Sequence, residues 1–429
     1  MWVENEQAAP LPDCMQRPPW VDRPAARKLP EAAAAAESMA EPAMPTFATK
    51  YGEKRPACSL HEEPEIGYKE LILSALAYSL CAPPQGEHDQ SRCRMSLEPL
   101  PRAGVPAILA AFDQVPLVAL GEAHGLQEEA DFLIALLHHP AFCTTVNAIV
   151  VEFGNALYQP VVDRFIAGEP VANADLRPIW RDFIGNPFGG FNAPIYEQFF
   201  RTVRAVNRTL PPQHRITVRL GDPPLDWGSV RSQDDVDSAM WQRDSHFAAV
   251  VDREVLGRAR RGLLITGSLH CLRGVRFGAN RLTAVQYIEQ RHPGATLVVL
   301  PHTGFRERTA ELEARMAAWP IPAIASVRGT WLGDLDPHLL FPTPPPLVAE
   351  DGSRDPRDPF AGLTVDAIAD AYLYLGPRAT LTASRPNPAI YRGDPPYLTE
   401  VQRRWHLAFE QALDTEALFT EGGPRYFDE

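Results

Sequence analysis

Six short apolar runs constrain the fold of this chain more than any other feature of its sequence. Each has four or five residues, does not alternate apolar with polar positions, and ends in small or polar residues. Such runs are typical of strands buried on both faces, as in a parallel sheet. With their endings, they are LVAL–GEAH (117–124), AIVV–EFGN (148–155), ITVRL–GDPP (216–224), LLIT–GSLH (263–270), TLVVL–PHTG (296–304) and AYLYL–GP (371–377).

Segments with the apolar spacing of helices alternate with these runs. They cover residues 126–139, 193–210, 233–261 and 281–292, and a last one covers 399–414. Strand–helix alternation over this length predicts an α/β fold, with a mainly parallel sheet and flanking helices. We expect residues 101–335 to form this α/β domain and residues 336–429 to be a C-terminal extension that packs on it.

The first hundred residues have a different composition. Residues 1–100 are rich in Pro, Ala and Glu, which predicts a largely disordered leader with a short apolar segment near 70–81. The stretch ELILSALAYSLCAPP (70–84) imitates the apolar part of a signal peptide, so both a cytoplasmic and an exported location stay open; a short packed helix is the other interpretation. No apolar run approaches the ~18 residues that span a bilayer.

Net charge, cysteine spacing and missing motifs argue against several classes of protein. The net charge of −13 argues against nucleic acid or an anionic membrane as the main partner. The six cysteines form no CxxC pair, so the chain is neither a zinc ribbon nor a disulfide scaffold. It also lacks the GxSxG, HExxH, GxxxxGK[ST] and GxGxxG motifs of serine hydrolases, zincins, P-loop proteins and Rossmann proteins. The oligomeric state stays open.

Chemically useful side chains follow the apolar runs. Ligands bind beyond the carboxyl ends of the strands in open parallel sheets. A helix cap needs only one Asp, Ser or Asn per helix, whereas these ends carry three histidines and four carboxylates, which favours a functional site. The residues are Glu122, His124, Glu152, Asn155, Asp222, Asp226, His270 and His302.

The GEAH segment suggests the chemistry. Glu122 and His124 are two positions apart, so on an extended segment their side chains point the same way. Glu152 and His270 follow other strands and can close on the same point. A histidine can take a proton from water while a carboxylate orients it. The set also fits a divalent metal held by two imidazoles and a carboxylate, and the sequence does not separate these two uses.

A helical segment and two strand ends are weaker candidates. Arg243 and His246 share one face of the 233–261 helix, and Asp244 lies between them. An arginine turned towards the site would stabilise an oxyanion, whereas the alternative is a solvated charged face. Asp222 and Asp226 in GDPPLDW also fit a turn set by two prolines, and His302 is equally open.

The order of the motifs resembles the ChaN-like haem-binding uptake/Tiki superfamily, which includes erythromycin esterases and TraB proteins. The resemblance covers roughly residues 105–305. Its motifs, in order, are LGEAH, VVEFGNALYQPVVDRFIAGE, IYEQFFRTVRAVN with a strand and a Gly-Asp turn, QRDSHFA, and LLITGSLHCLRG.

This resemblance implies a parallel-type sheet with flanking helices. It also implies that four features kept by the family's members are present here. They are Glu122 and His124 at a strand end, Glu152 after the next strand, Arg243 and Asp244 on a helix, and a late Gly-x-x-His from Gly267 to His270. The members diverge in function: erythromycin esterases open a macrolactone with a histidine-activated water, Tiki proteins resemble metal-dependent peptidases, and ChaN binds haem. GEAHG is one residue shorter than the esterases' Gly-Glu-x-x-His-Gly, which favours the ChaN and Tiki side.

We therefore expect a hydrolase that activates water on an ester or amide bond of a small-molecule or peptide substrate, with or without a metal. An alternative is a haem- or iron-binding protein with Tyr158 or a histidine as axial ligand. An inactive scaffold is less favoured, since each motif keeps its Glu and His. The catalytic candidates are Glu122, His124, Glu152, Arg243 and His270; the supporting candidates are Asn155, Asp222, Asp226, Asp244, His246 and His302.

Overall fold

The structure is a computed structural model that describes residues 96–187, 190–277, 281–341, 358–419, 425 and 426. Nearly all of the expected leader, including the apolar segment at 70–84, lies outside the described residues. The expectations about that leader and about export therefore stay predictions. No helix within the described ranges is long and apolar enough to cross a membrane.

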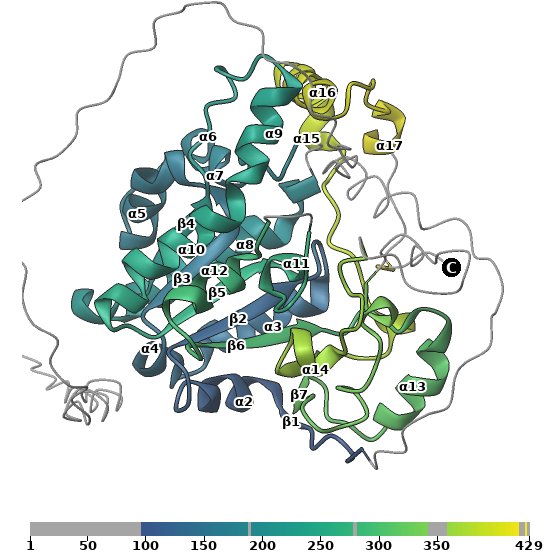
Figure 1. The fold of residues 1–429 in the computed structure, drawn as a ribbon. Coiled ribbons are helices and arrows are strands. Elements are labelled where there is room, and N and C mark those ends of the chain that lie inside the picture. The colour runs from purple at the N-terminus through teal and green to yellow at the C-terminus, as the bar shows by residue number, and fades with distance from the viewer. Residues whose placement is uncertain (1–95, 188–189, 278–280, 342–357, 420–424, 427–429) are drawn as a thin grey trace, which may run out of the picture. The chain divides into compact units, whose positions relative to one another are not determined.

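The described residues form an α/β fold around one mixed, mostly parallel sheet of eight strands (Figure 1). The strand order is β1-β7-β8-β6-β2-β5-β3-β4. The strands β8, β6, β2, β5, β3 and β4 run parallel to one another, whereas β7 pairs antiparallel with both β8 and β1. Their bounds are β1 (Arg102–Ala103), β2 (Leu117–Glu122), β3 (Ala148–Asn155), β4 (Thr217–Asp222), β5 (Gly262–Gly267), β6 (Thr296–Pro301), β7 (Ala323–Ser326) and β8 (Ala371–Tyr374).

All six apolar runs form strands, as predicted. The sequence pattern missed β1 and β7, which have two and four residues and lie at one edge of the sheet. Strand β8 lies inside the sheet, between β6 and β7, so residues beyond 335 contribute a strand to it. The domain boundary at residue 335 stays a prediction.

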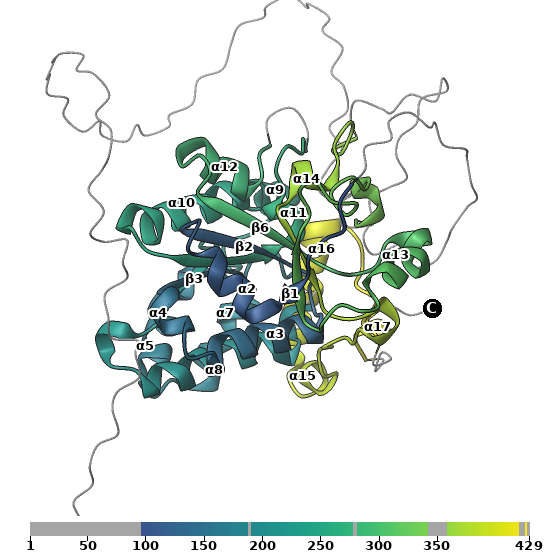
Figure 2. The ribbon, with the colours of Figure 1, turned by 90° about the horizontal axis from the view of Figure 1, so that it is seen from below.

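The central parallel strands bury both faces, because alternate side chains enter two different cores. Val118 and Leu120 of β2 join one core, with side chains from α3, α5 and α8. Leu117 and Ala119 join the other core, with side chains from α10 and α12. Figure 2 shows the sheet between these two helical layers. The continuous apolar runs in the sequence reflect this double burial.

The helices flank the sheet and include several single turns. They are α2 (Gly104–Ala111), α3 (Gln127–His138), α4 (Phe142–Thr145), α5 (Gln159–Ala167), α6 (Asn173–Leu176), α7 (Pro178–Arg181), α8 (Pro194–Thr209), α9 (Gln233–Trp241), α10 (Arg243–Glu254), α11 (Ser268–Cys271), α12 (Ala284–Arg291), α13 (Thr309–Met316), α14 (Val365–Ile368), α15 (Ala389–Arg392), α16 (Pro395–Phe409) and α17 (Thr415–Phe419). The long helix expected over 233–261 is two helices that meet at Gln242.

The strand register brings the carboxyl ends of the central strands together. Glu122, the last residue of β2, pairs with Gly267, the last residue of β5. Asn155 at the end of β3 likewise pairs with Asp222 at the end of β4. The polar residues that follow these strands therefore lie along one edge of the sheet.

Candidate functional site

Glu152 lies at the centre of the polar cluster. The sequence pattern placed it after a strand, but it lies within β3, between Val151 and Asn155, where the register against β4 shifts. Such an irregularity re-aims a side chain. The Glu152 side chain is 2% exposed and accepts hydrogen bonds from the Arg243 guanidinium and the Gly267 backbone N–H. Burial would raise the pKa of Glu152, but Arg243 and the two nearby histidines lower it far below its usual value, so Glu152 is an anion.

Arg243 connects two buried carboxylates. It is the first residue of α10, and its guanidinium lies 2.5 Å from Glu152 Oε1 and 2.6 Å from Asp222 Oδ1. Its side chain is only 2% exposed. Burial raises the pKa of Asp222 to about 6, although Arg243 and the Ile184 backbone N–H favour its charged form. The expected role of Arg243 in stabilising charge on a substrate does not suit this buried position; Arg243 instead holds Glu152.

Asp244, the next residue of α10, orients His270. Its Oδ1 lies 2.7 Å from Nδ1 of His270 and also accepts the Ala284 backbone N–H at 2.9 Å. Burial would raise the pKa of Asp244, but the neighbouring His270 lowers it, so Asp244 is the ionised partner. Nε2 of His270, on α11, then faces Glu152 Oε1 at 3.9 Å.

His124 is the exposed member of the cluster. Its side chain is 43% exposed, with Nδ1 3.4 Å from Glu122 Oε1 and Nε2 3.9 Å from Glu152 Oε1. The ring packs edge-on against Phe191, with centroids 4.8 Å apart. Burial would lower the pKa of His124, but the carboxylates of Glu122 and Glu152 outweigh burial and raise it. His124 therefore carries a proton at higher pH than an ordinary histidine.

The two histidines converge on one carboxylate oxygen. Nε2 of His124 and Nε2 of His270 each lie 3.9 Å from Oε1 of Glu152. This distance is too long for a direct hydrogen bond but suits a small group that bridges an imidazole nitrogen and the carboxylate oxygen. Glycine at 267 permits the approach, because a Cβ there would lie 2.8 Å from His124 Nε2.

Glu122 is fixed by a tyrosine that the sequence did not reveal. The hydroxyl of Tyr196, on α8, donates to Glu122 Oε1 at 2.7 Å and accepts the Gly125 backbone N–H at 3.1 Å. Burial and the Glu122 charge raise the pKa of Tyr196 well above its usual value, so it stays a donor. Tyr196 belongs to the IYEQFF motif of the family resemblance, but it looks like an ordinary apolar position of an amphipathic helix, so the sequence did not indicate its contact with Glu122.

Other predicted residues support the surrounding loops. Asn155 is fully buried; its side chain bonds the backbone of Leu157 and Leu225 and the Asp182 carbonyl. His246 faces the Gly221 carbonyl through Nδ1 at 2.6 Å. Both contacts shape the segments beside the cluster.

Two of the predicted residues lie elsewhere. His302 is fully buried after β6, where it bonds the Tyr372 hydroxyl at 2.7 Å and Glu313 at 2.8 Å. The Asp226 side chain is exposed and accepts a hydrogen bond from the Gly228 N–H. Asp226 lines a pocket at α16, which none of the five catalytic candidates lines, and its role in the site stays a prediction.

The cluster does not suit a metal ion. Within the described residues, no group of three or more His, Cys, Asp or Glu side chains could hold one. Both oxygens of Glu152 already accept hydrogen bonds, and the Arg243 guanidinium supplies the positive charge between Glu152 and Asp222. The reaction proposed below therefore uses no metal ion.

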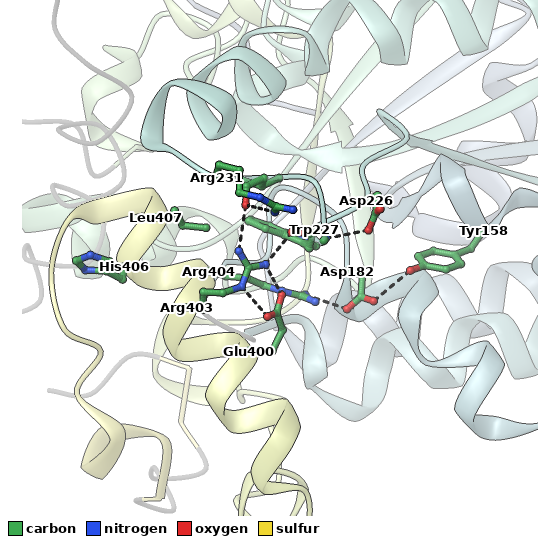
Figure 3. A pocket seen from close by; sticks show the side chains of 12 residues that line it. Tyr158, Asp182, Asp226, Trp227, Arg231, Glu400, Arg403, Arg404, His406 and Leu407 are labelled. Carbon is green, nitrogen blue, oxygen red and sulfur yellow. Dashed lines mark hydrogen bonds and ion pairs between the residues drawn. The ribbon is translucent and has the colours of Figure 1, made fainter.

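A pocket of about 670 Å³ lies at α16, away from the reactive cluster. Tyr158, Asp182, Glu400 and Arg404 line it, and none of the five catalytic candidates does. Figure 3 shows Arg404 between Asp182 and Glu400; it lies 2.9 Å from Asp182 and 2.8 Å from Glu400. These charges pair with one another, so they hold α16 in place and leave few groups for a ligand.

Tyr158 suits haem ligation poorly. Its hydroxyl lies in this pocket and contacts Asp182 Oδ2 at 3.3 Å. Burial and the Asp182 charge raise the pKa of Tyr158 to about 12, whereas an axial tyrosine binds iron as the phenolate. The axial role expected for Tyr158 is therefore not favoured by its surroundings.

No protein-family model and no curated protein matches this chain. Matching solved structures include an erythromycin esterase mutant in its open conformation (12% identity, 63% of this chain and 92% of that chain, TM-score 0.41). Another is ChaN of Campylobacter jejuni with cofacial haem (14% identity, 46% of this chain and 86% of that chain, TM-score 0.30). A third is a succinoglycan biosynthesis protein (9% identity, 68% of this chain and 96% of that chain, TM-score 0.41). Erythromycin esterases and ChaN are among the proteins that the motif order resembles. At these scores the matches assign no residue and no activity to this chain.

Proposed function

We propose that this protein is a hydrolase that activates water for attack on an ester or amide bond. The observation that carries the proposal is the pair of imidazole nitrogens, on His124 and His270, that each lie 3.9 Å from one oxygen of the buried Glu152. A water or a carbonyl group at this point is within reach of two proton-transfer groups and one fixed anion.

His270 is the general base of the proposed reaction. Asp244 is ionised and accepts a hydrogen bond from the Nδ1–H of His270, which leaves the lone pair of Nε2 directed towards Glu152. A buried carboxylate that holds one tautomer and stabilises the imidazolium is the arrangement of the serine hydrolase triads, here without a serine. The attacking nucleophile is therefore water.

His124 is the general acid. Each of its ring nitrogens faces a carboxylate, which is the environment of an imidazolium and explains the raised pKa of His124. Its exposure lets it contact a substrate that approaches from solvent. Two histidines with different neighbours thus take the two proton-transfer roles.

The proposed reaction balances with these two groups. The water oxygen bonds to the substrate carbonyl carbon, and one water proton passes to Nε2 of His270. The bond from this carbon to the leaving oxygen or nitrogen then breaks, and His124 protonates the leaving atom. The products are a carboxylic acid and an alcohol or amine, and proton exchange with solvent restores both histidines.

The remaining residues position this pair. Arg243 and the Gly267 N–H fix Glu152, and Tyr196 fixes Glu122. Preorganised groups of this kind need no rearrangement when charge develops during the reaction. The substrate class remains a small molecule or a peptide.

A panel of aryl esters, lactones and peptides, incubated with the purified full-length chain, tests the proposal. We expect turnover of at least one carbonyl substrate with chelator present. A haem titration in parallel tests the binding alternative. A Soret band that is lost in His124→Ala, with no turnover of any panel member, would overturn the hydrolase proposal in favour of haem binding.

A further inference from the structure

Glu129 is a buried acid next to the reactive cluster that the proposed reaction does not use. It lies in the first turn of α3 and is 1% exposed. Its Oε2 accepts the Ala123 backbone N–H at 2.9 Å. Ala123 is the residue between Glu122 and His124, so Glu129 holds the backbone from which both functional side chains project.

The side chains of Glu129 and Glu122 line the same small cavity. Both side chains line a space of about 20 Å³ between α3 and α8, whose other walls include Leu133, Phe153 and Phe199. Among the described residues, Oε1 of Glu129 and Oε2 of Glu122 are buried and have no hydrogen-bond partner. Two unpartnered carboxyl oxygens in an apolar cavity are costly unless a hydrogen-bonding group joins them.

The size of the cavity identifies that group. A space of about 20 Å³ accommodates about one water molecule and little more. A single water offers two donors and two acceptors, so it can contact both carboxyl groups at once. An apolar side chain or a larger ligand would leave both oxygens unsatisfied.

The surroundings of Glu129 favour its protonated form. Burial and the nearby Glu122 charge raise the pKa of Glu129 well above its usual value, against a smaller effect of the Ala123 N–H. Other titratable groups near it are Tyr196 from α8, Tyr426 from the C-terminal segment and Cys271 from α11, and the pKa values of all three are raised. A neutral Glu129 beside an anionic Glu122 avoids two like charges in one apolar cavity.

We propose that Glu129 is a positioning residue for the Glu122–His124 pair. One of its oxygens fixes the Ala123 backbone, and the other fixes Glu122 through one water in the cavity. This inference rests on the proposed function, because it assigns Glu129 to the orientation of the general acid His124. Glu129 itself touches no reacting atom.

Two substitutions separate this role from simple packing. Glu129→Gln keeps a carbonyl oxygen for the Ala123 N–H and adds an amide donor, so it imitates the neutral acid. Glu129→Leu matches the apolar walls and removes both contacts. Glu128→Leu is the matched control: it removes the preceding glutamate of the same turn, whose carboxylate bonds Thr382 instead of the Ala123 backbone.

The readouts are kcat, KM and the titration of the His124 imidazole, followed by NMR on histidine-labelled protein. We expect Glu129→Gln to resemble the wild type in all three. Glu129→Leu should lower kcat by about 10- to 100-fold with little change in KM, as for other misplaced catalytic groups, and move the His124 titration to lower pH. Glu128→Leu should leave the His124 titration unchanged.

The outcomes distinguish this inference from the hydrolase proposal. The NMR titration needs no substrate, so it tests the position of Glu122 even if no panel compound is hydrolysed. An unchanged His124 titration in Glu129→Leu would show a purely structural acid and overturn the inference. If Glu129→Gln behaves like Glu129→Leu, Glu129 acts as an anion, which also overturns it.

Discussion

Helix α10 carries an aspartate near each end, and each aspartate bonds a histidine. At the start of the helix, Asp244 lies 2.7 Å from His270; in its last turns, Asp252 lies 2.8 Å from His292. The first pair is buried, with side chains 6% and 11% exposed, whereas the second is 36% and 33% exposed. The two pairs have the same chemistry and almost the same distance, although His270 bonds through Nδ1 and His292 through Nε2, and their surroundings differ strongly.

The difference follows from the direction of the helix. Helix α10 crosses back from β4 to β5, so its first turn lies at the carboxyl edge of the sheet, and its last turns lie towards the start of β5. At the first turn, the free ring nitrogen of His270 faces Glu152; at the far end, Arg291 is the additional neighbour of Asp252. An aspartate–histidine pair is therefore a candidate for catalysis only where a third group completes the site.

The largest expected effect separates the two histidines. His270→Ala removes the proposed base and should lower kcat by about 10²- to 10⁴-fold, the usual contribution of a proton-transfer partner. His292→Ala, the matched control, should leave kcat nearly unchanged. Steady-state kinetics on the best panel substrate checks this. Equal losses in the two variants would show that both pairs serve stability, and the comparison would fail.

The arginines beside the two pairs should differ in stability. Arg243→Met leaves Glu152 and Asp222 buried without their cation, so we expect a loss of about 3–5 kcal/mol in the free energy of unfolding. Arg291→Met removes a pair with a 62% exposed arginine and should cost only about 0–1 kcal/mol. Denaturant unfolding of both variants measures the difference. Similar unfolding midpoints would contradict the anchoring role of Arg243.

A pH profile sharpens the assignment of His124. An acid must be protonated to act, and the pKa of His124 is raised above the ordinary 6.5. Turnover should therefore persist above pH 6.5 and fall only as the pH rises through this raised pKa. His124→Gln cannot titrate, so its slower residual turnover should lack that decline. A decline that survives in His124→Gln would assign the acid to another group.

Sequence pattern predicted the central strands because both of their faces are buried, which leaves a continuous apolar run. It missed β7, whose four residues are too few for a pattern, and it fused α9 and α10, because both keep helical spacing across Gln242. Of the candidate site, the structure brings Glu122, His124, Glu152 and His270 together. Their roles remain proposals that the experiments above test.

The sequence alone determined which strand ends carry acids and histidines, and a parallel sheet places such ends along one edge. Tertiary structure decided the direction of each side chain beyond that edge, because direction depends on bulges, turns and the start of the next helix. Glu152 faces the histidines where the register of β3 shifts, whereas Asp226, past the end of β4, is exposed. Packing brings Tyr196 to Glu122 from α8, a helix that lies far along the chain. Glu129 follows Glu122 closely in the sequence, but the ordinary amphipathic pattern of its helix does not indicate that the two side chains line one cavity.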